Sequence, residues 1–256
     1  MTNAAALAQL RESLKESAGG YLRNIVRIDG VTCQMCARPV EDESICSKCK
    51  WTYLPRGDVA DRIGSMIYGI DGKQSGRLMY GYKAAYTRPS HVQTVTSLAV
   101  LGLREHRQCA DRLVGVPVTK WATVPSLSKA IGVEHPLRTI LTGKIRAGNE
   151  IEVAAVSREK ITSPREVTPS NFDIRTDVPN GAHVMVIDDT WVSGGHAQSV
   201  AAALKQAGAS KVSVLTVARW VDLADPVSDR FYKKRIHTAT YDPAVCPWTG
   251  SDCPPP

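Results

Sequence analysis

The chain has 256 residues, 43% of them hydrophobic, and a formal net charge of +7. This length suits one α/β domain with a small additional module, and no apolar run is long enough to span a bilayer. The start of the chain lacks the apolar core and cleavage site of a signal peptide, so we expect a cytoplasmic protein without membrane insertion. The charge suits a polyanionic ligand or nucleic acid, although it is only mildly basic for this length.

The first predicted element is a helix at residues 3–17, which a pair of glycines ends. Two Cys-x2-Cys pairs follow, separated by nine residues: Cys33 and Cys36, then Cys46 and Cys49. Each pair supplies two thiolates from one tight turn, and two pairs complete a tetrahedral Zn²⁺ site without an open position. We therefore predict a structural zinc ribbon, which so small a module needs in order to fold. An iron–sulfur centre is the weaker alternative.

Beyond a hinge at residues 55–58, where Asp58 is expected to cap the next helix, strand-like and helical patterns alternate. The predicted helices are residues 77–86, 92–107, 126–131, 136–141, 197–207 and 226–236. The predicted strands are residues 113–118, 151–156, 184–187 and 211–217. This alternation indicates an α/β fold with a parallel sheet. The expected divisions are an N-terminal helix (1–20), the ribbon (21–55), the α/β domain (56–236) and a C-terminal tail (237–256).

Three further cysteines have no clear metal pattern. Cys109 lies in a helical, apolar context, which predicts a buried thiol. Cys246 and Cys253 belong to the tail, where a second metal site would need a partner such as His237. Because their spacing is not diagnostic, we expect a tail that packs on the body with two free thiols.

The stretch from residue 184 to residue 196 carries the chemistry. Its apolar run ends in Asp188 and Asp189, and a turn with two glycines then leads into an alanine-rich helix. Parallel sheets bind ligands at the carboxyl ends of their strands, and backbone N–H groups at a helix start suit phosphate. Two adjacent carboxylates at the end of a buried strand are costly unless they are paired or used. The spacing suits a ribose 5-phosphate, with acids for the hydroxyls and the turn for the phosphate.

This stretch resembles the phosphoribosyl-pyrophosphate (PRPP) motif of type I phosphoribosyltransferases, in which two acids and two variable residues precede Thr-Thr-Gly-x-Thr. Asp188 and Asp189 match the acids. The turn is filled by Val192, Ser193, Gly194, Gly195 and His196. Ser193 and Gly194 match well, whereas Val192 and His196 depart from the motif.

A four-cysteine ribbon ahead of such a motif is similar to the ComF family of amidophosphoribosyltransferase-like proteins, which are associated with natural competence. Other similar segments are residues 79–83, 113–118, 171–172 and 215–219. The family's Arg-Gly-Phe-Asn-Gln segment is absent after residue 118, and the chain continues well past residue 219. The acceptor substrate is therefore not carried over from the family.

The resemblance implies a type I phosphoribosyltransferase-like sheet flanked by helices, which binds PRPP with Mg²⁺ and transfers the phosphoribosyl group to an unidentified acceptor. Asp188 and Asp189 would hold the ribose hydroxyls, and one of them would assist as a base. Thr119 and Lys120, expected in the loop after the strand at 113–118, would hold pyrophosphate. A mobile lid between residues 156 and 172 would add cations: Arg158, Lys160 and Arg165.

A binding protein is the alternative to an enzyme. It would keep the site as a sensor of PRPP or a nucleotide, or would associate with DNA or with a competence-type protein partner. A homo-oligomer is compatible with both interpretations. Trp191 and Trp220 are candidates for shaping an acceptor pocket, although a core role is the commoner one for tryptophan.

Overall fold

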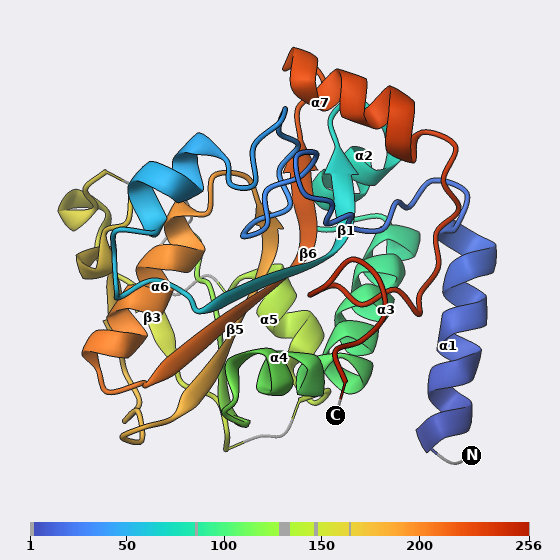
Figure 1. The fold of residues 1–256 in the computed structure, drawn as a ribbon. Coiled ribbons are helices and arrows are strands. Elements are labelled where there is room, and N and C mark those ends of the chain that lie inside the picture. Colours follow the sequence, from blue (N-terminus) through green and yellow to red (C-terminus); the bar gives the residue numbers. More distant parts are fainter. Residues whose placement is uncertain (1–2, 85–86, 128–133, 146–147, 164, 256) are drawn as a thin grey trace.

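The computed structural model describes residues 3–84, 87–127, 134–145, 148–163 and 165–255. Its centre is a four-stranded parallel sheet, in the order β1-β6-β5-β2 (Figure 1). These strands are β1 (Arg62–Ile70), β2 (Val118–Thr123), β5 (His183–Trp191) and β6 (Lys211–Val221). Two short strands, β3 (Val153–Ala155) and β4 (Phe172–Ile174), form a separate antiparallel pair. The predicted parallel α/β fold is confirmed.

Helices cover both faces of the sheet (Figure 1). On one face lies α6 (Gly195–Gln206), while α3 (Pro89–Glu105) packs on the other and α1 (Asn3–Ala18) packs on α3. The remaining helices are α2 (Gln74–Gly81), α4 (Arg107–Val114), α5 (Pro136–Leu141) and α7 (Pro226–Phe231). Short helical turns occur at Cys49–Tyr53, Arg158–Lys160, Pro169–Asn171 and Tyr232–Ile236. Within the described ranges, no helix combines the length and apolar character needed to cross a membrane.

The central strand β5 serves two separate cores. Val184 and Val186 pack with α6 and the four-cysteine segment, whereas Met185 and Ile187 pack with the helices of the other face. Successive side chains of a strand point to opposite faces, which explains this division. Because both faces are covered, β5 is a continuous apolar run rather than an alternating pattern. The side chains of the two acids that follow Ile187 alternate between the two faces of the sheet in the same way.

Two sequence predictions are wrong, one about a helix cap and one about a strand. Asp58 caps no helix; it pairs with Arg56, and the strand β1 follows it. The apolar run at residues 113–118 is not a strand, because α4 extends to Val114 and Gly115, with a φ of 77°, ends it in the left-handed conformation. The strand β2 begins only at Val118 and therefore contains the two residues that were expected in the following loop.

Most predicted helices are confirmed with shifted ends, and α5 has the predicted bounds. Of the predicted helix at 126–131, residues 128–131 lie outside the described residues. The C-terminal tail packs on the body as expected, since Tyr241, Cys246 and Trp248 are buried within the core.

Candidate functional site

A cavity of about 500 Å³ opens at the carboxyl end of β5. Asp188 and Thr190 line it from the strand, and Arg165 lines it from the segment between β3 and β4. The rest of its wall is the predicted phosphate turn and the residue after it: Val192, Ser193, Gly194, Gly195, His196 and Ala197. One acid of the pair and the whole turn therefore meet around a single space.

The two glycines of this turn are required by its geometry. Gly194 has a φ of 90°, and a Cβ added there would overlap the ring of Trp191. A Cβ added at Gly195 would lie 2.6 Å from the carbonyl oxygen of Arg165. Gly195 is also the first residue of α6, whose first N–H groups have no partner within the helix. The turn thus combines close backbone packing with the start of a helix, where the helix dipole and backbone N–H groups suit an anion.

Side chains from two distant segments hold the turn from behind. Arg219, at the end of β6, donates from Nη1 to the carbonyl oxygens of Trp191 at 2.7 Å and Val192 at 2.9 Å. Tyr53 donates from its hydroxyl to the carbonyl oxygen of Ser193 at 2.5 Å. Its ring packs edge-on against Trp191, with the ring centroids 6.3 Å apart. Trp191 is only 1% exposed and supports the turn from within, so it does not shape an open acceptor pocket.

The two acids point to opposite faces of the sheet. Asp188 continues the face of Val184 and Val186, and it is half-buried in the cavity wall. Asp189 is 6% exposed and faces the other side. Its Oδ2 accepts hydrogen bonds from the Tyr82 hydroxyl and from Lys83 Nζ, both at 2.6 Å. Within the pair itself, the Asp189 N–H donates to Asp188 Oδ1 at 2.8 Å.

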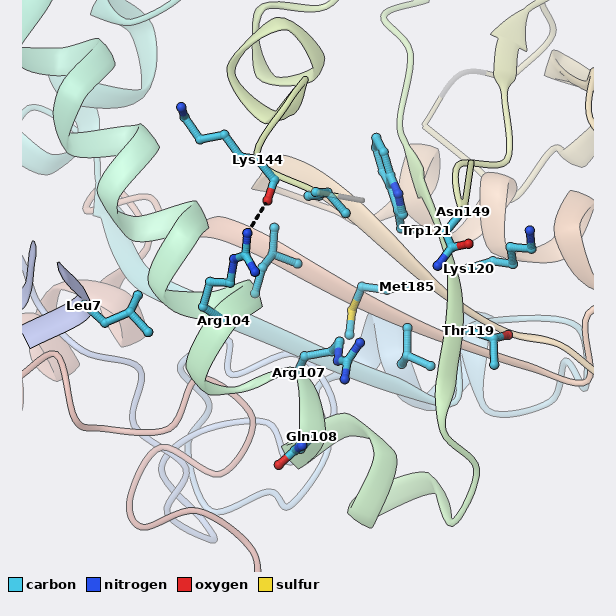
Figure 2. A pocket seen from close by; sticks show the side chains of 13 residues that line it. Leu7, Arg104, Arg107, Gln108, Thr119, Lys120, Trp121, Lys144, Asn149 and Met185 are labelled. Atoms are coloured by element: carbon cyan, nitrogen blue, oxygen red, sulfur yellow. Dashed lines mark hydrogen bonds between the residues drawn. The ribbon is translucent and has the colours of Figure 1, made fainter. Parts of the chain in front are cut away.

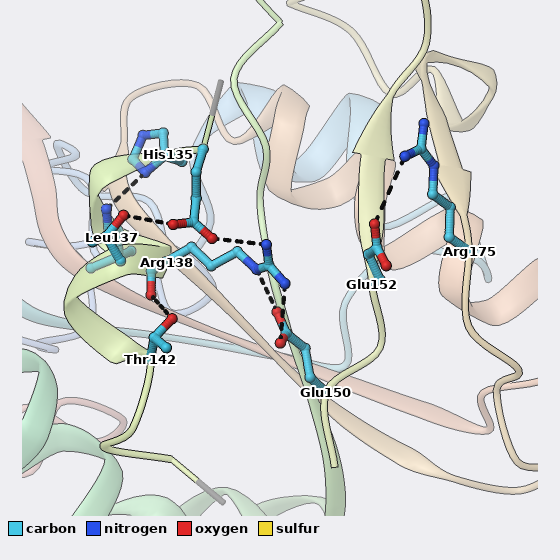
Figure 3. A network of polar contacts seen from close by, with 9 residues as sticks. His135, Leu137, Arg138, Thr142, Glu150, Glu152 and Arg175 are labelled. Carbon is cyan, nitrogen blue, oxygen red and sulfur yellow. Dashed lines mark hydrogen bonds and ion pairs between the residues drawn. The ribbon is translucent and has the colours of Figure 1, made fainter. Parts of the chain in front are cut away.

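A histidine completes the surroundings of Asp189. His135 lies immediately before α5, where its Nδ1 accepts the N–H of Leu137 at 3.2 Å (Figure 3). Its Nε2 lies 3.7 Å from Asp189 Oδ2. Arg138, on the first turn of α5, forms ion pairs with Glu134 at 2.8 Å and with Glu150 at 2.7 Å. These contacts fix the start of α5 and with it the position of His135.

These surroundings separate the pKa values of the two acids. Burial, and then the negative charge of Asp189, raise the pKa of Asp188 to about 8. Burial opposes ionisation of Asp189 as well, but the charges of Lys83 and His135 and two hydrogen bonds outweigh it and lower the pKa of that carboxyl. The two carboxyls therefore differ, with Asp188 favouring the protonated form and Asp189 the ionised form.

The raised pKa of Asp188 predicts a specific pH dependence of stability. An unfolded aspartate has a pKa of about 3.9, so the folded protein holds a proton that the unfolded chain releases. This stabilising contribution is complete below about pH 4 and is lost as the pH rises through about 8. We expect Asp188→Asn to raise the melting temperature at about pH 8.5, and by several degrees more there than at about pH 5. Thermal unfolding of both proteins checks this; parallel pH profiles would contradict it.

Thr119 and Lys120 are not in the predicted loop. Both belong to β2, in which Val118 pairs with His183 and Lys120 with Val184, at the start of β5. They line a different cavity, of about 430 Å³, together with Arg104, Arg107 and Lys144 (Figure 2). The predicted loop position is wrong because β2 begins where the strand was expected to end. Neither residue lines the cavity of Asp188.

The predicted lid contributes one cation to the cavity. Arg165 lines it, whereas Arg158 and Lys160 lie on an exposed 3-10 turn and do not. The segment is docked on α6, since the N–H of Thr168 donates to Ser199 Oγ at 2.8 Å. Movement of this segment stays a prediction.

The four predicted metal ligands come together in one buried cluster. The Sγ atoms of Cys33, Cys36, Cys46 and Cys49 all lie within 4.8 Å of one another, and those of Cys36 and Cys46 are 3.8 Å apart. Two sulfurs bound to one tetrahedral zinc ion are separated by about 3.8 Å, so this cluster could bind a metal such as zinc. A helical turn, Cys49–Tyr53, leads directly from the last ligand to the tyrosine that holds the phosphate turn.

Several residues of these sites have no local signal in the sequence. Tyr82, Lys83 and His135 are brought to Asp189 by the fold, and only the first two lay in a segment that resembled a known family. A second group of potential metal ligands lies at the margin of the core on the opposite face, with only its last member exposed: His106, Cys109, Cys246 and Cys253. It includes the three remaining cysteines but not His237.

Comparison with known proteins assigns no family to the chain. No protein-family model matches it, and no curated protein matches it significantly. The features established for the chain are its parallel α/β sheet, the four-cysteine cluster near the N-terminus and the cavity beside β5.

Proposed function

We propose that the protein is a phosphoribosyltransferase-like enzyme of the ComF type, which binds PRPP with Mg²⁺ and transfers the phosphoribosyl group to an unidentified acceptor. One observation carries this proposal: a single cavity is lined both by a carboxylate at the end of a parallel strand and by a glycine turn at a helix start. The first suits ribose hydroxyls and the second suits a 5′-phosphate.

The roles of the residues follow from their positions. The N–H groups of the turn and the Ser193 hydroxyl hold the 5′-phosphate, and Arg165 adds a positive charge at the rim. Asp188 accepts from the ribose hydroxyls after losing its proton, while Asp189, held by Lys83 and Tyr82, positions it from behind. In the reaction the C1′–O bond breaks, pyrophosphate leaves with the bonding electrons, and the acceptor forms the new bond to C1′.

Two metal ions belong to this proposal. Zinc occupies the four-cysteine cluster, where four thiolates close its coordination shell and make it structural. The Asp188 carboxylate is an oxygen donor of the kind that Mg²⁺ prefers, and such an ion bound with PRPP would offset the charge on pyrophosphate. Ordering of the sugar and its phosphate by the protein's own residues supplies the positioning that such a reaction needs.

Calorimetric titration with PRPP and Mg²⁺ tests the binding site. Asp188→Asn is expected to weaken PRPP binding by more than about tenfold, since a hydrogen bond to a charged acceptor contributes about 1.5–3 kcal/mol. Lys120→Ala is the matched control, because Lys120 lies in the other cavity and should leave PRPP affinity unchanged. Equal effects of the two substitutions, or no effect of the first, would refute the assignment.

A non-catalytic sensor of PRPP or a nucleotide is the second candidate. It is favoured by the fact that Asp189 is already occupied by Lys83 and Tyr82, so that only Asp188 of the pair lines the cavity. Pyrophosphate release across a panel of bases, amines and nucleic acids separates the two, because a sensor binds PRPP without releasing pyrophosphate. Association with DNA or a protein partner stays a prediction.

A further inference from the structure

Every cysteine of the chain belongs to one of two groups of potential metal ligands. Of the seven cysteines, four form the cluster beside the phosphate turn, and the other three meet His106 in the opposite core. In this second group, Nδ1 of His106 lies 3.4 Å from the sulfur of Cys253 and 4.0 Å from that of Cys109. All four potential ligand atoms lie within 4.8 Å of one another. The edges of a zinc tetrahedron are about 3.5–3.8 Å, so the two separations from His106 lie close to this range.

Parts of the chain that are far apart in the sequence build this group. His106 lies between α3 and α4, and Cys109 is on the first turn of α4. The tail that follows α7 runs back across β1 to reach them (Figure 1). Its path is fixed where the N–H of Ser65 donates to the carbonyl of Pro247 at 3.2 Å and where Trp248 Nε1 donates to the carbonyl of His106 at 2.9 Å.

The tail then presents its two cysteines on one loop. The N–H of Cys246 donates to the carbonyl of Ser251 at 2.8 Å, and the N–H of Gly250 donates to the carbonyl of Cys246 at 2.8 Å. Arg112 holds the far side of the loop through the carbonyl of Pro254 at 2.8 Å. The chain around both thiols is thus ordered by contacts that do not involve the sulfur atoms.

We propose that His106, Cys109, Cys246 and Cys253 bind a second structural zinc ion, which fastens the C-terminal tail to α3 and α4. Three thiolates and one imidazole are a common closed zinc set. The three thiols release their protons on binding, and Nδ1 of neutral His106 supplies the fourth electron pair. A disulfide would use only two of the four groups and would leave the third sulfur and His106 without a role.

The two sites differ in their access to solvent. Cys253 is exposed, whereas the other three ligands of this site and all four cysteines of the first cluster are buried. A chelator can therefore attack the second zinc through Cys253 while the first stays shielded. The tail site should lose its metal first.

Metal analysis of the full chain, purified under reducing conditions, tests the proposal. We expect about two zinc ions per chain in the wild type and about one in the Cys246→Ser, Cys253→Ser variant. His237→Ala removes a histidine outside both groups and should keep about two. His106→Cys should also retain the second zinc, because it preserves a four-ligand set, whereas His106→Ala should lose it.

Cobalt substitution gives a readout that does not depend on comparing folded yields. The thiolate-to-metal absorption of the wild type arises from seven Co–S contacts, and loss of the second site should remove the three that Cys109, Cys246 and Cys253 supply. A wild type that takes up only one zinc when zinc and reductant are in excess would overturn the proposal. A Cys246–Cys253 disulfide in a protein that lacks the second metal would do so as well.

Discussion

Replacing both Cys33 and Cys46 with serine is expected to abolish metal binding at the first cluster and to lower the free energy of unfolding by more than about 4 kcal/mol. The two substitutions remove one thiolate from each Cys-x2-Cys turn, so neither turn keeps both of its metal ligands. Both positions are buried in the core shared with α6 and β5, where unpaired hydroxyls add a further penalty. Urea denaturation and metal analysis of wild type and variant measure the two effects.

A conservative substitution distinguishes the loss of the metal from the loss of the contact between Tyr53 and the turn at residues 192–196. Tyr53→Phe keeps the ring against Trp191 but removes the hydrogen bond to the Ser193 carbonyl. It should retain the full metal content and lose only about 1 kcal/mol of stability. If the double serine variant instead kept its metal and its stability, the cluster would not be a metal site.

Lys83→Met is expected to lower the free energy of unfolding by about 3 kcal/mol, because it leaves the buried Asp189 carboxylate without its cation. The Lys83–Asp189 distance is 2.6 Å, and the Asp189 side chain is only 9% exposed. Lys233→Met is a matched control, since Lys233 pairs with Asp229 at 2.7 Å but is 69% exposed. Removal of that surface pair should change stability by less than about 1 kcal/mol.

A second substitution shows that the loss comes from the unpaired charge. Asp189→Asn removes the charge but keeps an oxygen for the Tyr82 hydroxyl, so adding it to Lys83→Met should recover much of the stability. Chemical denaturation of the single and double variants gives the coupling free energy. If the two losses simply added, Lys83 would not be needed to neutralise Asp189.

Local patterns predicted the centre of the fold because the decisive interactions there are local or repetitive. The strand β5, the turn and α6 follow from an apolar run, two glycines and an alanine-rich helix, and these elements are confirmed. The strand β1 was missed because glycines weaken its pattern. At Gly64 the reason for glycine is a tryptophan far along the chain, since a Cβ there would lie 2.7 Å from the ring of Trp248.

Long-range partners could not be predicted from one sequence. The position of Lys83 beside Asp189 depends on how α2 and α3 pack against the sheet, and the family-like segment at residues 79–83 does not indicate its partner. The grouping of His106 with Cys246 depends in the same way on the path of the tail. The error at Lys120 had a local cause, because the end of α4 and its glycine cap were interpreted as the beginning of a strand, which shifted the predicted strand toward the N-terminus.

The hydrogen bonds from Arg219 to backbone carbonyls should affect the rate at which a ligand binds. This guanidinium, only 3% exposed, holds the backbone oxygens of Trp191 and Val192 from inside the protein, and Tyr53 holds that of Ser193. The amides of the turn are therefore oriented before any ligand arrives. A phosphate ester bound there as proposed would meet a receptor that is already ordered, and little of its binding energy would go into ordering the loop. Its association rate should then be set by diffusion and charge rather than by loop folding.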